Sequence, residues 1–463
     1  MAGRPSLSRS LRVWMNGERV ARWTLTAHGG HELAYDLAWL QSPRRRALSL
    51  SLPLQELAHR GEVVANYFGN LLPDSLAVRK ALAQRHRTSA DEFSLLAAIG
   101  RDCIGAVQLL PEDQEPTGVH SVQYETLQEH EVEALLSRAQ TSTPWAADEE
   151  ELRISLAGAQ DKTALLWHEE RWCRPLGATP TTHILKLPLG EVGQVHADFS
   201  TSVDNEWLCN RLMNALGLPV PAVRIERFGQ HRVLVVERFD RRWQPEGWCA
   251  RLPQEDFCQV YGIASDHKYE AHGGPRLQRI MQTLRGSVNA VEDRHRVFLT
   301  QVLFWVLAAP DGHGKNFSIF LLPEGAFRLT PLYDVLSAWP VVGKGAHNFS
   351  WHKLKLAMAV RTTSNHYAMH TLQRRHFNEA ARRLELGADF EEPLRKLVHE
   401  LPRAFEQVRE CLPPDFATPV FEAVRKGALE QCEKLPRQDP AVLAVAEAQD
   451  EPQSPEETWG PAP

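Results

Sequence analysis

Residues 308–318 read Ala308-Ala309-Pro310-Asp311-Gly312-His313-Gly314-Lys315-Asn316-Phe317-Ser318 and form a short polar stretch between two apolar runs. The run 302–307 leads into this stretch, and the run 317–322 leads out of it. Within it an aspartate and an asparagine stand five positions apart, with a histidine and a lysine between them. The simplest interpretation is a surface loop between two buried elements, in which aspartate and glycine serve the turn.

The interval from Asp311 to Asn316 also has a chemical interpretation. Protein-kinase catalytic loops use the same spacing, with an aspartate that accepts the proton of the substrate hydroxyl and an asparagine that holds Mg²⁺. Asp334 follows in Thr330-Pro331-Leu332-Tyr333-Asp334, where a second metal-binding carboxylate could return. Lys315 adds a cation that could hold a transferred phosphate. Spacing alone leaves both interpretations open, because short motifs are weak evidence.

Length and composition restrict the class of protein. A chain of 463 residues is too long for one ordinary core and predicts two or three domains. An apolar content of 43% and a charged content of 24% are typical of globular proteins. The net charge of −6 argues against autonomous, non-specific binding to DNA, which usually needs a strongly basic surface.

The cysteines and the apolar runs indicate a compartment. The seven cysteines are odd in number and no Cys-x-x-Cys pair occurs, so we expect free thiols and no zinc ribbon. We expect no secretory signal in the first residues. No apolar run approaches the roughly 18–20 residues that cross a bilayer. A cytoplasmic protein with no membrane contact is the expectation.

Residues 11–111 are predicted to form a small α+β unit. Apolar and polar residues alternate around Asn16-Gly17, a pair that strongly indicates a β-hairpin. The alternation returns in 48–52 and stops at Pro53, as in an edge strand. The sequence Leu71-Leu72-Pro73-Asp74-Ser75 then opens a helical pattern.

Four further regions follow this unit. Residues 112–150 are predicted to be a polar connector with one helix around 129–140. In 151–255 we predict strands within 153–166, a strand at 183–188, a helix over 205–217 and two strands around Gly229. From 256 to 435 the pattern is mostly helical, and the acidic tail 436–463 is predicted to be disordered.

Lys186 interrupts an otherwise apolar strand. An exposed lysine on an edge strand is the common case, whereas a buried lysine needs a partner for its charge. Glu206, on the following predicted helix, is one candidate partner, and a nucleotide phosphate is another. The sequence alone leaves these alternatives open.

Two more segments could face a nucleotide. Ser155-Leu156-Ala157-Gly158-Ala159-Gln160-Asp161-Lys162-Thr163 ends like a Walker A loop but fails its pattern, so an ordinary hairpin is the favoured interpretation of this segment alone. Its small residues would still let backbone amides approach an anion. Glu237-Arg238-Phe239-Asp240-Arg241 follows a predicted strand and could present its backbone to a flat heterocycle. Asp240 could then meet a ribose hydroxyl or an arginine.

Together these segments resemble the HipA family of serine/threonine protein kinases, the toxin halves of bacterial toxin–antitoxin pairs. The resemblance covers about residues 11 to 435, and the number and order of the matching phrases make it specific. The matching phrases are Ile154-Ser155-Leu156-Ala157-Gly158-Ala159-Gln160-Asp161-Lys162-Thr163, Thr182-His183-Ile184-Leu185-Lys186-Leu187-Pro188, Glu237-Arg238-Phe239-Asp240-Arg241, Asp311-Gly312-His313-Gly314-Lys315-Asn316-Phe317-Ser318, Leu329-Thr330-Pro331-Leu332-Tyr333-Asp334, Tyr67-Phe68-Gly69-Asn70-Leu71-Leu72-Pro73-Asp74 and Ile99-Gly100-Arg101-Asp102-Cys103-Ile104-Gly105-Ala106-Val107-Gln108.

The resemblance implies an α+β fold: a small N-terminal α+β domain and a kinase-like bilobal fold with a mostly helical C-terminal lobe. It also implies roles for individual residues. Asp311 would be the general base, and Asn316 and Asp334 would hold Mg²⁺. The ATP-binding positions would be Ala157, Gly158, Ala159, Gln160, Asp161, Lys162, Lys186, Glu237, Arg238, Phe239, Asp240, His313, Gly314, Lys315, Asn316, Tyr333 and Asp334, with Glu237 and Phe239 facing adenine.

Ser155 corresponds to the serine that family members autophosphorylate. A charge of about −2 on this residue would expel its loop from the phosphate site and switch the kinase off. Two positions depart from the family pattern. Pro310 stands where the family usually has a polar residue, and Gly314 stands where it usually has alanine. Both could alter the rigidity of the loop without removing a catalytic group.

The function that the resemblance implies is an ATP- and Mg²⁺-dependent kinase that inhibits translation and growth and promotes persistence. Its partner would be a HipB-like helix-turn-helix antitoxin, which would also bring operator DNA. The family precedent for a substrate is glutamyl-tRNA synthetase. One alternative is an attenuated kinase that acts mainly as corepressor in the antitoxin–operator complex. Another is a small-molecule or lipid phosphotransferase, although no basic amphipathic segment indicates a membrane surface.

Overall fold

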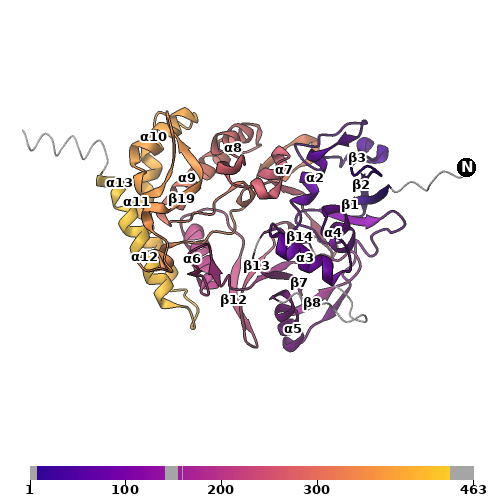
Figure 1. Ribbon diagram of the computed structural model, residues 1–463, viewed down its shortest axis with the longest axis horizontal. Helices are drawn as coiled ribbons and strands as arrows, with labels where there is room; N and C mark the ends of the chain where they lie inside the picture. Colours follow the sequence, from indigo (N-terminus) through magenta and orange to yellow (C-terminus); the bar gives the residue numbers. More distant parts are fainter. Residues whose placement is uncertain (1–7, 141–154, 159, 438–463) are drawn as a thin grey trace, which may run out of the picture.

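The computed structural model describes residues 8–140, 155–158 and 160–437. The predicted disordered tail, Ala159 and the stretch 141–154 therefore lie outside the described residues, except that 436 and 437 are described. An N-terminal sheet lies at one end of the molecule and the last helices of the chain lie at the other (Figure 1). None of the described helices is long and apolar enough to cross a membrane.

The N-terminal sheet is antiparallel, with the strand order β4-β3-β2-β1-β5. Its strands are β1 (Arg9–Met15), β2 (Glu18–Leu25), β3 (His31–Tyr35), β4 (His59–Arg60) and β5 (Val107–Pro111). The predicted hairpin at Asn16-Gly17 is confirmed: both residues have positive φ, 46° and 85°, as a tight two-residue turn requires.

The predicted strand at 48–52 is wrong. Only an isolated bridge joins Ser49 and Leu52. The alternation arises because Leu48 and Leu52 are fully buried, whereas the Ser49 hydroxyl donates a hydrogen bond to Glu255. A buried loop can thus imitate the two-residue period of a strand.

Short helices cover this sheet. They are α1 (Leu37–Gln41), α2 (Glu62–Gly69), α3 (Leu76–Arg85) and α4 (Glu92–Ile99). Phe68 of α2 and Phe93 of α4 pack on Trp23, with ring centroids 3.9 Å and 4.8 Å away. Helix α3 begins after Ser75, whose hydroxyl accepts a hydrogen bond from the Val78 amide and so caps the helix. The segment 70–75 therefore lies outside the helix.

A second antiparallel sheet has the strand order β12-β13-β9-β7-β8-β6. Its strands are β6 (Tyr124–Thr126), β7 (Lys162–His168), β8 (Arg171–Pro175), β9 (His183–Lys186), β12 (Val223–Phe228) and β13 (His231–Glu237). The predicted strand at 183–188 and the pair around Gly229 are confirmed. Of the strands predicted within 153–166, the second is present as β7. The first falls partly outside the described residues, and described residues 155–158 make one isolated bridge, between Gly158 and Pro73.

The predicted connector 112–150 takes part in this sheet. Its strand β6 pairs with β8, and its predicted helix is present as α5 (Glu129–Gln140). Leu185 of β9 and Val235 of β13 belong to the same apolar core as Leu136 of α5. Successive strand residues point to opposite faces, so Lys186 lies on the face away from this core.

The C-terminal portion is mostly helical, as predicted, with short strands at its centre. Its helices are α7 (Phe257–Tyr261), α8 (Leu277–Thr283), α9 (Ala290–Val306), α10 (Arg374–Arg383), α11 (Glu391–Arg409), α12 (Thr418–Cys432) and α13 (Lys434–Arg437). Its strands are β16 (Gln254–Asp256), β17 (Ser318–Leu321), β18 (Phe327–Leu329), β19 (Lys355–Arg361) and β20 (Asn365–Ala368). Helix α6 (Ser202–Ala215), predicted over 205–217, contacts β12, β13, α11 and α12 and so joins this portion to the second sheet.

The loop 307–317 is held between two buried elements. Helix α9 ends at Val306, and the residues of the apolar run that precedes the loop are fully buried or nearly so. Strand β17 follows the loop and is the middle strand of the sheet β16-β17-β18. The loop is therefore fixed at both ends, and its polar residues His313, Lys315 and Asn316 are buried, whereas Asp311 is exposed.

Candidate active site

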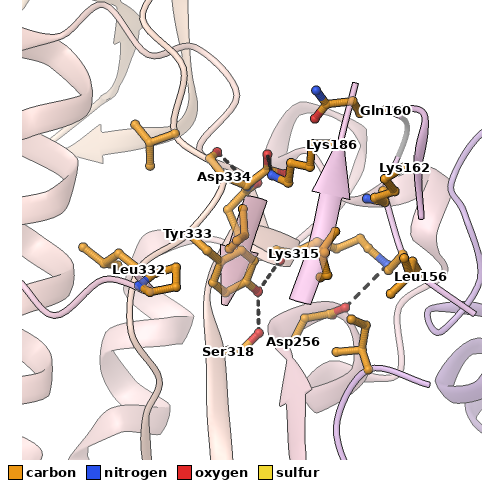
Figure 2. A pocket seen from close by; sticks show the side chains of 18 of the residues that line it. Leu156, Gln160, Lys162, Lys186, Asp256, Lys315, Ser318, Leu332, Tyr333 and Asp334 are labelled. Atoms are coloured by element: carbon orange, nitrogen blue, oxygen red, sulfur yellow. Dashed lines mark hydrogen bonds and ion pairs between the residues drawn. The ribbon is translucent and has the colours of Figure 1, made fainter. Parts of the chain in front are cut away.

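A cleft of about 210 Å³ lies where the second sheet, the C-terminal portion and the N-terminal unit meet. Figure 2 shows its wall, with Lys162 and Lys186 on one side and Tyr333 and Asp334 opposite them. The predicted residues that line the cleft are Ala157, Gly158, Gln160, Lys162, Lys186, Glu237, Arg238, Phe239, Asp240, Asp311, His313, Lys315, Asn316, Tyr333 and Asp334. Asp161, Gly314 and Ser155 are not among its lining residues, and Ala159 is not described.

Lys186 is buried at the centre of the sheet rather than exposed at an edge. Its ammonium group donates to Glu206 Oε1 at 2.6 Å and to Asp334 Oδ1 at 2.9 Å. Burial opposes the charge of Lys186, but the two carboxylates outweigh it and raise the pKa of the lysine. Burial likewise opposes the charge of Asp334, but Lys186 and Lys162 lower the pKa of that carboxyl group. The lysine and Asp334 are therefore both charged at neutral pH.

Asn316 and Asp334 lie side by side in the cleft. The Asn316 side chain is buried and its Nδ2 donates to the Asp334 carbonyl oxygen at 3.3 Å. Its Oδ1 has no hydrogen-bond partner among the described residues. A buried amide oxygen without a donor, next to an ionised carboxylate, is a donor set that suits a hard cation. No group of three or more His, Cys, Asp or Glu residues that could hold a metal occurs in the described part of the chain. Mg²⁺ often binds through one or two protein ligands plus substrate phosphates, so the pair fits that ion.

Asp311 opens into the cleft, with 56% of its side chain exposed. The tyrosyl hydroxyl of Tyr269 donates a hydrogen bond to its Oδ1. Desolvation by the surrounding walls raises the pKa of Asp311, although the Tyr269 hydrogen bond and the charge of Lys268 act in the opposite direction. The Tyr269 contact was not predicted, because Tyr269 lies 42 residues before Asp311 in the sequence.

His313 lies beside Asp311 and is neutral. Its Nε2 is 3.8 Å from Asp311 Oδ1, and its ring meets the Tyr269 ring edge-on, with centroids 5.0 Å apart. Burial and the nearby charge of Lys268 lower the pKa of His313 to about 3. Among the titratable groups at this position, the aspartate is therefore the one that can accept a proton near neutral pH.

Lys315 does not point to the place expected for a transferred phosphate. Its ammonium group donates to the Asn70 carbonyl at 3.1 Å and to Asn70 Oδ1 at 2.8 Å. It also lies 3.4 Å from both Asp74 and Asp256. Two hydrogen bonds and two ion pairs thus hold the ammonium group, so its side chain ties the loop to the N-terminal unit.

Lys162 is better placed for an anion than Lys315. It pairs with Lys186 across β7 and β9, so both side chains lie on one face of the sheet. Burial and the charge of Lys186 lower the pKa of Lys162 to about 8. Gly158 approaches it closely: a Cβ atom on Gly158, where φ is +105°, would lie 2.5 Å from the Lys162 Nζ. The glycine thus leaves the ammonium group open to the cleft.

In the segment that follows β13, the side chain of Phe239 and those of Arg238 and Asp240 have different surroundings. The Phe239 ring lies 5.6 Å from the Tyr333 ring and 5.9 Å from the Phe320 ring, as measured between centroids. The side chains of Arg238 and Asp240 instead form a buried ion pair, with Nη2 and Oδ2 2.8 Å apart. Of the two partners considered for Asp240, the structure shows the arginine. Within this segment, Phe239 contributes an aromatic ring to the lining of the cleft.

Ser155 is buried against the N-terminal unit. Its Oγ donates to the Leu71 carbonyl at 2.7 Å, and its amide donates to the Asp102 carbonyl at 3.0 Å. The hydroxyl has no exposed surface in this conformation. Any modification of this serine therefore requires the loop to leave its present position.

Gly314 and Pro310 are the two departures noted in the sequence. A Cβ atom on Gly314 would lie 2.3 Å from Pro275 Cγ, so the glycine allows the loop to pack tightly on the segment before α8. Pro310 lies four residues after the end of α9, and its missing amide donor leaves Ala309 as the last residue bonded back to that helix, through the Phe304 carbonyl. Neither residue removes a polar group from the cleft.

Comparison with known proteins now places the chain in a family. Residues 154–408 match the HipA-like C-terminal domain, and residues 11–110 match the HipA N-terminal domain. The Sinorhizobium fredii protein Y4mE, whose name describes a kinase, is 37% identical over 334 residues, which cover 71% of this chain and 77% of that protein. The serine/threonine-protein kinase toxin HipA of Shewanella oneidensis is 30% identical over 327 residues, 65% of this chain and 69% of that protein.

A solved structure shares the fold. The HipA chain in a complex of the Shewanella oneidensis toxin–antitoxin proteins HipA and HipB with operator DNA superposes with a TM-score of 0.76. The identity is 24%, and the alignment covers 92% of this chain and 97% of that one. The matched domains account for the N-terminal unit, the second sheet except β6 and most of the helical portion, and the chain therefore belongs to the HipA family of kinases.

Proposed function

We propose that this chain is an ATP- and Mg²⁺-dependent protein kinase that phosphorylates serine or threonine hydroxyls and acts as the toxin of a toxin–antitoxin pair. One observation carries the proposal: Asp311, Asn316 and Asp334 meet Lys186, which lies 148 positions before Asp334 in the sequence, in a single cleft. Phosphoryl transfer depends mainly on positioned charges of this kind and on a base near the attacking hydroxyl.

Each residue has a part that its surroundings support. Lys186 and Lys162 would neutralise phosphate oxygens, since both ammonium groups lie on the cleft face of the sheet. Asn316 and Asp334 would hold Mg²⁺, which supplies further positive charge to the phosphates when bound. Asp311 would accept the proton of the substrate hydroxyl, because its carboxylate is exposed to the cleft while the neighbouring histidine stays neutral.

Autophosphorylation of Ser155 is the proposed off-switch. The residue belongs to the segment that carries Gly158 and leads into Lys162, the first residue of β7, so displacement of this segment would remove part of the phosphate site. A phosphoserine carries a charge of about −2 and cannot occupy the buried position that the hydroxyl now fills beside the Leu71 carbonyl. The phosphorylated loop would therefore stay out of the position that it occupies in this structure.

We also propose a HipB-like helix-turn-helix antitoxin as partner in the cytoplasm. The Shewanella oneidensis protein of the same fold was solved with HipB and operator DNA. The net charge of −6 suggests that contact with DNA is made mainly through the antitoxin. Glutamyl-tRNA synthetase, the family precedent, is the proposed substrate, through which the kinase would inhibit translation and promote persistence.

The test is label transfer from radioactive ATP with Mg²⁺ to purified glutamyl-tRNA synthetase, with wild type beside Asp311→Ala. The proposal expects label on the synthetase with the wild type alone. Label on neither the synthetase nor this chain would refute the kinase. Label on this chain only would refute the synthetase as substrate.

The corepressor alternative has its own test. An operator-binding assay with the antitoxin, with and without this chain, compares wild type and Asp311→Ala. Enhanced operator binding by both proteins, together with no phosphate transfer by the wild type, would favour a corepressor. The convergence of Asp311, Asn316 and Asp334 in one cleft favours the active kinase instead.

A further inference from the structure

The segment 262–276 precedes helix α8, and side chains of the N-terminal unit form hydrogen bonds and an ion pair with it. The Asn66 and Asn70 side-chain amides donate to the carbonyls of Gly262 and Ile263, each at 2.8 Å. Arg79 Nη2 donates to Ser265 Oγ at 3.2 Å. Farther along, the Lys268 ammonium group donates to Asp74 Oδ2 at 3.0 Å. All these contacts come from the short stretch 66–79 of the N-terminal unit.

The same segment holds the proposed base. Tyr269 follows Lys268 directly, and its hydroxyl donates to Asp311 Oδ1. The Lys268 carbonyl accepts a hydrogen bond from the Gly314 amide at 3.4 Å, and Gly314 packs on Pro275 with no room for a Cβ atom. The position of Lys268 therefore fixes both the tyrosine and the loop that carries Asp311.

Asp74 contacts this arrangement at two points. Besides Lys268, its carboxylate lies 3.4 Å from the Lys315 ammonium group, one residue before Asn316. The Asp74 side chain is only 9% exposed, and the Lys268 and Lys315 side chains are 15% and 5% exposed. Buried ion pairs are geometrically demanding, and removal of one partner leaves uncompensated charge. One carboxylate thus connects Lys315, which is buried, to Lys268, which is largely buried and directly precedes Tyr269.

We infer that Asp74, contributed by the N-terminal unit, is a positioning residue of the kinase site. It holds Lys268 so that Tyr269 orients the Asp311 carboxylate, and it holds Lys315 so that Asn316 stays in place. The inference rests on the proposed function of Asp311 and Asn316. The inference goes beyond that function because it assigns the N-terminal unit a role in positioning the active-site residues.

The kinetic test compares Asp74→Asn, Tyr269→Phe, Lys268→Met and Lys268→Arg with wild type in label transfer to glutamyl-tRNA synthetase, or to Ser155 where only that site is labelled. A displacement of about 1 Å at a reacting group can lower a rate ~100-fold. We therefore expect kcat to fall ~10- to 100-fold in the first three variants, with the KM for ATP nearly unchanged. Lys268→Arg retains the charge that pairs with Asp74 and should keep most of the activity.

Asp36→Asn is the matched control. Asp36 also belongs to the N-terminal unit and pairs with Arg19, but this pair lies near the surface and does not line the cleft. Its substitution should leave kcat unchanged. An Asp74→Asn variant with the kcat of the control would overturn the inference, as would a loss of activity in Lys268→Arg equal to that in Lys268→Met.

A second measurement does not depend on activity. Amide hydrogen exchange in Asp74→Asn should be faster than in wild type over residues 262–276 and 311–316, and unchanged there in Asp36→Asn. Unchanged exchange over both stretches in Asp74→Asn would overturn the inference even if the kinase is active. If the wild type transfers no phosphate, the proposed function fails, while faster exchange in Asp74→Asn would still support the coupling between the N-terminal unit and the loop.

Discussion

Asp102 is the best single position at which to test whether the N-terminal unit and the second sheet form one structural body. Its carboxylate is buried and faces three guanidinium groups, with distances of 3.3 Å to Arg238, 2.9 Å to Arg241 and 3.0 Å to Arg251. The Thr181 hydroxyl donates to it as well, at 2.6 Å. We propose Asp102→Asn, which keeps the shape of the side chain and removes its charge.

The expected loss follows from the charges in this buried cluster. Three arginines are balanced by two carboxylates, those of Asp102 and Asp240, so the cluster carries one excess positive charge. The substitution leaves two uncompensated positive charges in a site with almost no exposed surface. Removing one partner of a buried pair typically costs about 3–5 kcal/mol, a large share of the ~5–15 kcal/mol that stabilises an ordinary domain.

The assay is urea unfolding at neutral pH followed by circular dichroism, with Asp36→Asn as control. The Asp36–Arg19 pair is partly exposed, with side-chain exposures of 18% and 44%, so its loss should change the free energy of unfolding by at most ~1 kcal/mol. A free energy of unfolding for Asp102→Asn within about 1 kcal/mol of the wild-type value would refute the reasoning, because removal of a buried, paired charge should destabilise the protein by more.

Four further outcomes are expected. Wild type and Asp102→Asn should converge in free energy of unfolding as the pH falls below about 4. Burial opposes the Asp102 charge, but Arg241, Arg251 and Arg238 lower the pKa of this carboxyl group in the folded state, so its contribution to stability is complete above the unfolded pKa and is lost in acid. A difference between the two proteins that stays constant with pH would contradict this. Lys186→Met should weaken ATP binding by ~10- to 100-fold in calorimetry, since a hydrogen bond to a charged group is worth about 1.5–3 kcal/mol, and unchanged affinity would exclude a phosphate contact. The acid limb of the kcat/KM profile should lie above the ordinary aspartate pKa of about 3.9, because burial raises the pKa of Asp311 and the base must be deprotonated; a limb at or below that value would exclude Asp311 as base. Ser155→Ala should keep its transfer rate after preincubation with Mg²⁺ and ATP, whereas wild type should lose it, and equal loss in both would exclude this serine as the switch.

Much of the fold was accessible from local patterns. The hairpin at Asn16-Gly17, the strand around Lys186 and the helix α5 follow from turn chemistry and periodicity, which act over a few residues. The strand expected at 48–52 failed because the same alternation was produced by a buried loop, whose Ser49 is paired with a residue 206 positions away. Local patterns do not contain such a partner.

The site residues divide in the same way. The spacing of Asp311 and Asn316 identified the loop, and the partner suggested for Lys186, Glu206, is present at 2.6 Å. Asp240 pairs with Arg238 and Arg241 of its own segment, one of the two partners that the sequence suggested, and its Oδ2 also accepts from the Gly105 amide of the N-terminal unit. The direction of Lys315 was not predictable, because only the tertiary structure brings Asp74 near it. Tyr269 and Asp74 were missed for the same reason.

Incubation of the purified chain with Mg²⁺ and ATP, followed by intact mass and phosphosite mapping, tests the central claim most directly, with wild type beside Asp311→Ala. The account predicts one added phosphate on Ser155 in the wild type and none in the variant. Wild-type protein that binds ATP and gains no phosphate on any residue would contradict the proposed kinase. Phosphate on both proteins would contradict the role of Asp311.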